Sequence, residues 1–157
     1  MFDAYYSDAC TIFNLCPEQI ILFVEEKNKI DEEIDKILLS FDNGNNLFIA
    51  NQIADYICNN ATYNVEKDSS KDILWTGEGN CNAFALLFHA MCNRVNIKCD
   101  LLTGYANGEY HAWNRIMLED GSYRYYDLSF YEYSENYKYI AASSSHWEIV
   151  GINRYLQ

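Results

Sequence analysis

The spacing of the apolar residues changes at Asn96, and this change constrains the fold more than any other feature. Before Asn96, apolar residues recur at helical spacing, whereas after it they fall into short runs typical of strands. Three helices are predicted, at 18–39, 47–58 and 81–94, and four strands, at 97–105, 110–118, 122–128 and 147–152. The polar segment 59–71 is expected to be an exposed connection. The helix at 81–94 is apolar on more than one side, which predicts that it is the central buried helix. Helices followed by an antiparallel sheet predict the α+β class.

The length of 157 residues suits one domain with a single sizeable core. Half of the residues are apolar, and one Pro with seven Gly argues against a long linker. We therefore expect a single domain over 1–157, with an N-terminal helical extension at 1–45 and a core at 46–157.

The net charge of −12 argues against nucleic-acid binding, because no basic patch is present to neutralise phosphates. It also disfavours adhesion to an anionic membrane, while a cationic partner or substrate fits it. The longest apolar run, Ile20 to Val24, falls far short of the ~20 residues that span a bilayer. The start of the chain lacks the basic segment of a signal peptide. The sequence thus agrees equally with a cytoplasmic protein and with a secreted or cell-surface protein trimmed of its leader, and it does not indicate an oligomeric state.

Six cysteines are too sparse to indicate a disulfide scaffold in a chain that can build its own core. Cys58 and Cys92 lie in apolar helical patterns and are expected to be buried. A metal site could group His89 with Cys92 and Cys99, but no paired ligand motif supports it, and a hydrogen-bonded His89 in or near the core is preferred. No metal and no cofactor are expected.

Cys81 follows the break Thr76-Gly77-Glu78-Gly79-Asn80 and opens the third helix. A thiol at a helix N-terminus feels the positive end of the helix dipole, which favours the nucleophilic thiolate. The backbone N–H groups of that turn could also bind an oxyanion. The alternative is a buried structural cysteine, which position alone would favour.

His111 and Asp127 can be placed relative to each other through a predicted hairpin. If Glu119-Asp120-Gly121 is a three-residue loop, Leu118 pairs with Ser122 and Trp113 pairs with Asp127. His111 is then the diagonal neighbour of Asp127 on the same sheet face, at roughly 7–8 Å between Cα atoms. A two-residue loop would put the two side chains on opposite faces. Taken singly, His111 could be an ordinary half-buried histidine and Asp127 a carboxylate facing water.

Three motifs in this order resemble the core of the transglutaminase-like superfamily. They are Gly79-Asn80-Cys81-Asn82-Ala83-Phe84-Ala85, His111-Ala112-Trp113-Asn114 and Tyr125-Tyr126-Asp127. The stretch from Arg94 to Gly104 also resembles the family's link from helix to strand. The resemblance covers about 75–130, and none is visible in 1–45. Two departures from the pattern are Ala83-Phe84 after the cysteine and Asn96 in place of a loop glycine, where Asn tolerates the left-handed conformation.

The resemblance implies a papain-like fold and a cysteine hydrolase or acyltransferase acting on an amide of a peptide or protein. Cys81 would attack the carbonyl, His111 would carry the proton, and Asp127 would orient His111. The oxyanion would be bound by the Cys81 N–H and an upstream side chain, for which Trp75 is the candidate, with core packing as its alternative role. Trp113 and Asn114 are further oxyanion or substrate candidates.

Two other functions are compatible with these residues. One is an inactive scaffold or binding module, since a fold does not determine a function. The other is an arylamine N-acetyltransferase-like enzyme, for which the chain is short and shows no evident acetyl-CoA site.

Overall fold

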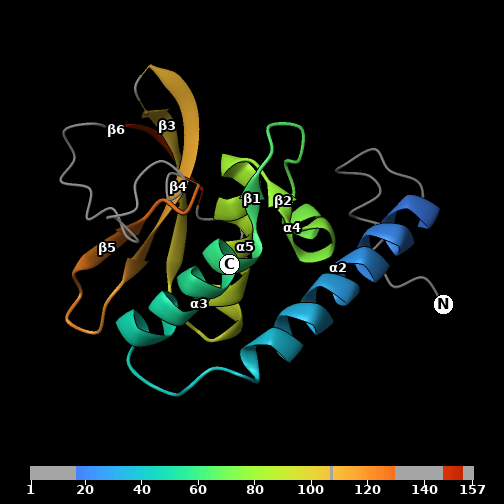
Figure 1. The fold of residues 1–157 in the computed structure, drawn as a ribbon, viewed down its shortest axis with the longest axis horizontal. Coiled ribbons are helices and arrows are strands. Elements are labelled where there is room, and N and C mark those ends of the chain that lie inside the picture. The colour runs from blue at the N-terminus through green and yellow to red at the C-terminus, as the bar shows by residue number, and fades with distance from the viewer. Residues whose placement is uncertain (1–16, 107, 130–146, 154–157) are drawn as a thin grey trace. The chain divides into compact units, whose positions relative to one another are not determined.

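The computed structural model describes the backbone of residues 17–106, 108–129 and 147–153, and the side chains of 21–105 and 108–129 (Figure 1). The chain forms two compact units, Met1–Ile37 and Leu38–Gln157. The described part of the first unit is helix α2 (Pro17–Leu38), whose last residue opens the second unit. Along α2, Lys27 pairs with Asp31 and Lys36 lies 3.1 Å from Glu33. The helix predicted at 18–39 is therefore present, displaced by one residue at each end.

Helix α3 (Asn46–Asn60) begins where the Asn45 side chain accepts a hydrogen bond from Phe48 N at 2.9 Å. Its buried stripe has helical spacing and consists of Ala50, Ile53, Ala54 and Ile57. The start of the helix is fixed to the hairpin loop 119–121, because Asn46 N donates to the Glu119 carboxylate at 2.6 Å. This helix corresponds to the one predicted at 47–58.

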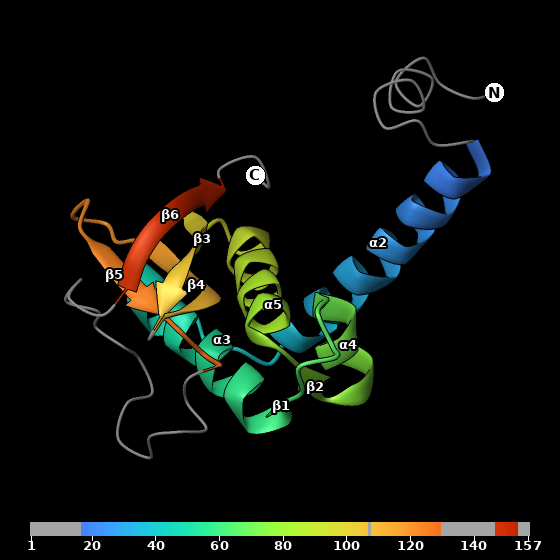
Figure 2. The ribbon, with the colours of Figure 1, turned by 90° about the horizontal axis from the view of Figure 1, so that it is seen from above.

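Four strands form one antiparallel sheet in the order β5-β4-β3-β6 (Figure 2). They are β3 (Cys99–Ala106), β4 (Glu109–Met117), β5 (Tyr123–Tyr126) and β6 (Trp147–Asn153). Each of the four predicted strands is present, and the α+β prediction is confirmed.

The β4–β5 hairpin has the predicted register. Asn114 pairs with Tyr126, and the Leu118 N–H donates to Ser122 O at 2.8 Å. The loop between them holds three residues, and Gly121 takes the left-handed conformation with φ of 82°. Continuing this register by one residue sets Trp113 opposite Asp127, which places His111 and Asp127 on the same face of the sheet.

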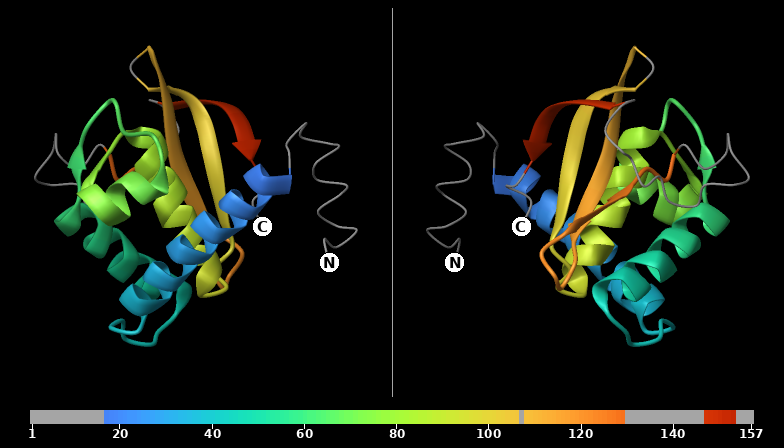
Figure 3. Two further views of the ribbon diagram at one scale, coloured as in Figure 1. Left: turned by 90° about the vertical axis from the view of Figure 1, so that its right-hand side faces the viewer. Right: turned by 90° about the vertical axis from the view of Figure 1, so that its left-hand side faces the viewer.

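Helix α5 (Cys81–Arg94) is the central element of the second unit. It packs on β3 and β4 and also contacts α3 and α4 (Ser70–Thr76), and the three helices lie on one side of the sheet (Figure 3). The rings of Phe88 and Tyr126 pack against each other in a tilted arrangement, with centroids 4.7 Å apart. After the helix, Asn96 has φ of 60°, so asparagine does occupy the left-handed position expected of it.

The segment predicted as an exposed connection, 59–71, contains more structure than expected. Strand β1 (Thr62–Tyr63) pairs in parallel with β2 (Glu78–Gly79), and α4 begins at Ser70. The start of α4 is stabilised by the Asp72 carboxylate, which accepts hydrogen bonds from the Ser69 N–H and hydroxyl. The break at 76–80 therefore includes the second strand of a small sheet next to Cys81.

Within the described ranges, the helices are too short or too polar to cross a membrane.

Candidate active site

Cys81 is the first residue of α5, and Asn80 fixes the start of this helix. The backbone of Asn80 is extended, and its side chain accepts hydrogen bonds from Asn82 N at 3.0 Å and Ala83 N at 3.2 Å. Two N–H groups of the first turn are thus used by the cap. The Cys81 N–H is the remaining candidate on this turn for holding an oxyanion.

The Cys81 thiol is half-buried and forms a side-chain hydrogen bond with His111. Burial alone would raise the pKa of the thiol. Hydrogen bonds from the His111 ring and the Ala112 N–H outweigh burial and hold the pKa of Cys81 below its ordinary value. The site therefore stabilises the thiolate more than an ordinary cysteine environment does.

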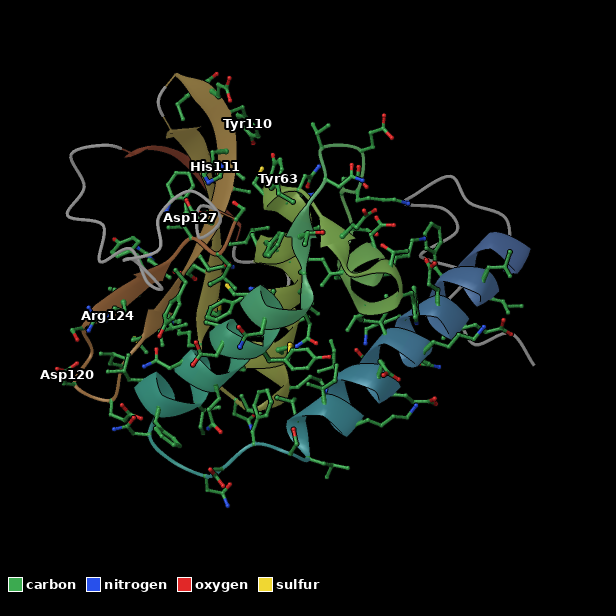
Figure 4. The ribbon with its side chains drawn as sticks, viewed as in Figure 1. Tyr63, Tyr110, His111, Asp120, Arg124 and Asp127 are labelled. Atoms are coloured by element: carbon green, nitrogen blue, oxygen red, sulfur yellow. The ribbon has the colours of Figure 1, made fainter. Side chains whose placement is uncertain are left out.

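His111 and Asp127 form the second link, at 2.7 Å between Nε2 and Oδ2 (Figure 4). The two side chains are 12% and 3% exposed. Burial lowers the pKa of His111, but the hydrogen bonds to Asp127 and Cys81 raise it to about 9. Because Nε2 faces Asp127, Nδ1 is the nitrogen that remains for Cys81. The structure thus brings together all three residues predicted from the hairpin and the helix start.

Trp113 and Asn114 hold this arrangement from the sheet. Trp113 is 2% exposed and stacks on His111, with ring centroids 5.9 Å apart and an interplanar angle of 21°. Asn114 is fully buried, and its amide nitrogen donates to Ala85 O at 3.0 Å. The Asn114 amide nitrogen is thereby committed to joining β4 to α5.

Ser129 contacts the site without having been singled out in the sequence. Its hydroxyl donates to Asp127 Oδ1 at 3.1 Å, and it is 6% exposed. The only signal was a hydroxyl residue two positions after the aspartate, a spacing too common to indicate a role.

The segment 62–68 also lies against the start of α5. Asn64 N donates to Gly79 O at 2.9 Å, Asn80 N to Lys67 O at 2.6 Å, and Asn82 Nδ2 to Asp68 O at 3.0 Å. The turns and polar residues of this segment predicted a connection. They carry no local signal for these long-range contacts.

Trp75 lies on the last turn of α4, six residues before Cys81, and is 51% exposed. Its side chain is therefore directed largely to solvent and not into the core. Its role as an oxyanion donor stays a prediction.

His89, Cys92 and Cys99 meet at the other end of α5. His89 is 4% exposed and lies 2.9 Å from Asn93 Nδ2, which confirms a hydrogen-bonded histidine in the core. Burial raises the pKa of both thiols, but hydrogen bonds from Cys92 and His89 lower that of Cys99 to about 7. Cys92 is fully buried as predicted, while Cys58 is only half-buried. Among the residues that the structure describes, no group of three or more His, Cys, Asp or Glu could hold a metal ion.

Two solved structures share the fold. A candidate cysteine protease from Cytophaga hutchinsonii superposes with a TM-score of 0.61 at 21% identity, covering 81% of this chain and 42% of the other. A structure described as a TGase gives 0.57 at 15% identity, covering 80% and 36%. At these identities the likeness concerns the fold alone, and it confirms the papain-like, transglutaminase-like architecture.

Comparisons of the sequence also find relatives. Kyphoscoliosis peptidase from Mus musculus and from Homo sapiens are each 33% identical over 84 residues, which cover 41% of this chain. The chain spans only 13% of the length of these relatives. Residues 41–128, more than half of the chain, match the transglutaminase-like superfamily. The chain belongs to the transglutaminase-like superfamily.

Proposed function

We propose that this chain is a cysteine hydrolase or acyltransferase that acts on an amide of a peptide or protein through an acyl-enzyme on Cys81. The observation that carries the proposal is the continuous hydrogen-bonded series from Cys81 through His111 to Asp127. It begins at the N-terminus of a helix and ends at the buried carboxylate of Asp127. The family membership supports the same function.

The shifts in pKa support a thiolate and imidazolium pair as the resting state. The pKa of Cys81 is lowered and that of His111 is raised to about 9, so both shifts move the proton from sulfur to the ring. Asp127 stabilises the imidazolium and fixes which ring nitrogen faces Cys81. A thiolate is the form of cysteine that attacks a carbonyl carbon.

The proposed reaction has two halves. The Cys81 sulfur forms a bond to the carbonyl carbon, and the oxyanion accepts a hydrogen bond from the Cys81 N–H. His111 then gives its proton to the departing amine as the carbon–nitrogen bond breaks, leaving a thioester. Water or an amine next attacks the thioester and loses a proton to His111, and the carbon–sulfur bond breaks. The products are the free amine with an acid, or with a new amide.

Selective alkylation tests the nucleophile. Iodoacetamide at pH 6 to 7 should modify Cys81 faster than Cys58, which is also half-buried and serves as the internal control. His111→Ala should slow modification of Cys81 and leave that of Cys58 unchanged. Equal rates at the two thiols in the unmodified protein would favour the inactive scaffold or binding module.

Product analysis separates hydrolysis from transfer. An electrophilic activity probe that labels Cys81 would first identify an acyl donor by competition with a peptide library. Incubating that donor with and without a primary amine then shows by mass spectrometry whether an acid or a new amide is formed. A donor that blocks labelling but yields neither product would count against both activities.

A further inference from the structure

The Asp127 carboxylate is bound at both of its oxygens. Oδ2 lies 2.7 Å from His111 Nε2, and Oδ1 accepts a hydrogen bond from the Ser129 hydroxyl at 3.1 Å. Asp127 is 4% exposed and Ser129 is 6% exposed, so both hydrogen bonds form in a buried region, where they are stronger than in water. The carboxylate thus joins His111 to a buried serine.

The backbone on either side of Asp127 is held by buried neighbours. Tyr126 is fully buried, and its hydroxyl donates to Asn51 Oδ1 on α3 at 2.8 Å. Leu128 is 4% exposed, and its carbonyl accepts a weak hydrogen bond from the Cys58 thiol at 3.9 Å. These neighbours fix the place of the Asp127 backbone. Rotation about the side-chain bonds of Asp127 is the freedom that remains.

The hydrogen bond from Ser129 limits this rotation. The torsion that turns a carboxylate about its Cβ–Cγ bond has only a broad preference of its own, so neighbouring donors decide its value. The His111 ring and the Ser129 hydroxyl lie at different oxygens, and together they define the plane of the carboxylate. Without the hydroxyl, the carboxylate can turn until Oδ2 no longer points at His111 Nε2. The imidazolium then loses part of its stabilisation by Asp127.

We propose that Ser129 is a positioning residue, whose hydroxyl holds the Asp127 carboxylate in the orientation in which Oδ2 faces His111. The inference rests on the proposed function of Cys81, since Ser129 acts on the thiol through Asp127 and His111. It extends the hydrogen-bonded series by one side chain, so that the series runs from Cys81 through His111 and Asp127 to Ser129.

The turn between β4 and β5 contains a matched pair of residues. Ser122 also follows an aspartate by two positions, and its hydroxyl donates to Asp120 Oδ1 at 2.6 Å. Both residues of this pair are exposed. Ser122→Ala therefore removes the same type of hydrogen bond, at the same spacing in the sequence, without removing a contact of the site.

The pH profile of Cys81 alkylation tests the inference on the full chain, with each cysteine followed by peptide mass spectrometry. Ser129→Ala should slow modification by iodoacetamide at pH 6.5 about two- to fivefold and shift the profile to higher pH, because the imidazolium beside the thiolate is less stabilised. Ser129→Thr retains the hydroxyl and should restore the profile, whereas Ser122→Ala should leave it unchanged. Urea unfolding provides the comparison, since a purely structural role would lower stability without moving the profile.

The ring tautomer of His111 gives a second measurement, which does not depend on the reaction of Cys81. Above its pKa of about 9, neutral His111 should carry its proton on Nε2, which faces Asp127. In Ser129→Ala the share of the form protonated on Nδ1 should rise, because the carboxylate no longer holds the Nε2 proton in place. Nitrogen-15 NMR of the histidine side chains reports both tautomers, and His111→Gln assigns the signals.

A double-mutant cycle shows whether Ser129 acts through Asp127. In an Asp127→Ala background, Ser129→Ala should not change the alkylation profile further. An equal shift in both backgrounds would assign Ser129 another role and overturn the inference, as would an unchanged profile for Ser129→Ala alone. Should Ser129→Ala not fold, Ser129→Cys, which has nearly the same size and is a weaker donor, should shift the profile in the same direction.

The unmodified protein separates failure of this inference from failure of the proposed function. If iodoacetamide modifies Cys81 faster than Cys58 but Ser129→Ala keeps the profile of the unmodified protein, the positioning role is wrong and the nucleophile stands. If the two thiols of the unmodified protein react alike, the proposed function itself fails.

Discussion

His111 Nε2 and Asp127 Oδ2 lie 2.7 Å apart, although the two residues are diagonal neighbours across the hairpin and not direct partners. The residue opposite Asp127 by continuation of the register is Trp113, whose ring stacks on the imidazole. The imidazole is therefore held at its edge by a carboxylate and on one face by an indole. This leaves Nδ1 for Cys81 and fixes the direction in which the ring can exchange a proton.

Replacing Asp127 by asparagine should remove the negative charge beside His111 while the side chain keeps almost the same shape. The amide can still accept a hydrogen bond but carries no charge, so the pKa of His111 should fall from about 9 towards its ordinary value. Alkylation of Cys81 by iodoacetamide at pH 6.5 should slow about tenfold or more, because one pKa unit is a factor of ten in the ratio of protonation states. The rate measured from pH 5 to 10 should approach that of the unmodified protein at the alkaline end.

Ser129→Ala is the control for Asp127→Asn. It removes the hydroxyl that donates to Asp127 Oδ1 but leaves the carboxylate in place. Its effect on the alkylation rate should be smaller than that of Asp127→Asn. An unchanged pH profile for Asp127→Asn would show that the carboxylate does not set the state of His111.

The pH dependence of turnover should differ from that of alkylation. The thiolate and imidazolium pair exists between the lowered pKa of Cys81 and the raised pKa of His111, near 9. Below this range the thiolate is protonated, and above it His111 has lost the proton that the leaving amine requires. Hydrolysis of a peptide amide should therefore give a bell-shaped kcat/KM profile with an alkaline limb near pH 9. Iodoacetamide needs no proton from His111, so its rate should not fall above pH 9. A parallel fall of both rates would contradict the assignment of the alkaline limb to His111.

Much of the site could be predicted because it depends on local rules. The diagonal placement of His111 and Asp127 follows from the twofold alternation of strands and from Gly121, which permits a three-residue loop. The start of α5 follows from the Gly-containing break before Cys81. Each of these signals lies within a few residues of the feature that it determines.

The features near Cys81 that were not predicted depend on contacts between segments that are distant in the sequence. Strand β1 has two residues and pairs in parallel with β2, so neither has enough length to show a period. The placement of 62–68 beside Cys81 follows from this pairing and was not predicted. Helix α4 did have a readable signal, since Ser69 and Asp72 have the spacing of a capping box. The polar composition of the residues before Ser69 favoured a connection, and the capping-box signal was therefore not used.

Gly79→Ala should disturb the junction that positions Cys81. A Cβ atom at Gly79 would lie 2.7 Å from Ile73 Cγ1 and 2.8 Å from Ala83 Cβ, closer than atoms in a core can approach. The free energy of unfolding should fall by about 1–3 kcal/mol, and alkylation of Cys81 should slow as Asn80 shifts. Urea unfolding and the iodoacetamide rate measure the two effects.

Gly121→Ala is the matched control for Gly79→Ala, because it makes the same substitution in the β4–β5 loop. The added Cβ would meet nothing within 4 Å, and the cost comes from the φ of 82°. Stability should fall by about 1–2 kcal/mol while the reactivity of Cys81 is retained. If Gly121→Ala slowed alkylation as much as Gly79→Ala, general destabilisation would explain both.

Asn114→Ala should weaken the attachment of α5 to β4. The Asn114 amide is fully buried and donates to Ala85 O, one helical turn after Cys81. Its loss leaves a buried carbonyl without that donor and should cost about 1–3 kcal/mol in urea unfolding. Asn82→Ala is the control, because its hydrogen bond to Asp68 O is solvent-exposed and should contribute about 1 kcal/mol or less.

If Asn114 also sets the distance from Cys81 to His111, Asn114→Ala should shift the alkylation profile of Cys81 to higher pH, since the thiolate then loses part of its stabilisation by the imidazolium. A loss of stability with an unchanged profile would assign Asn114 to the core alone.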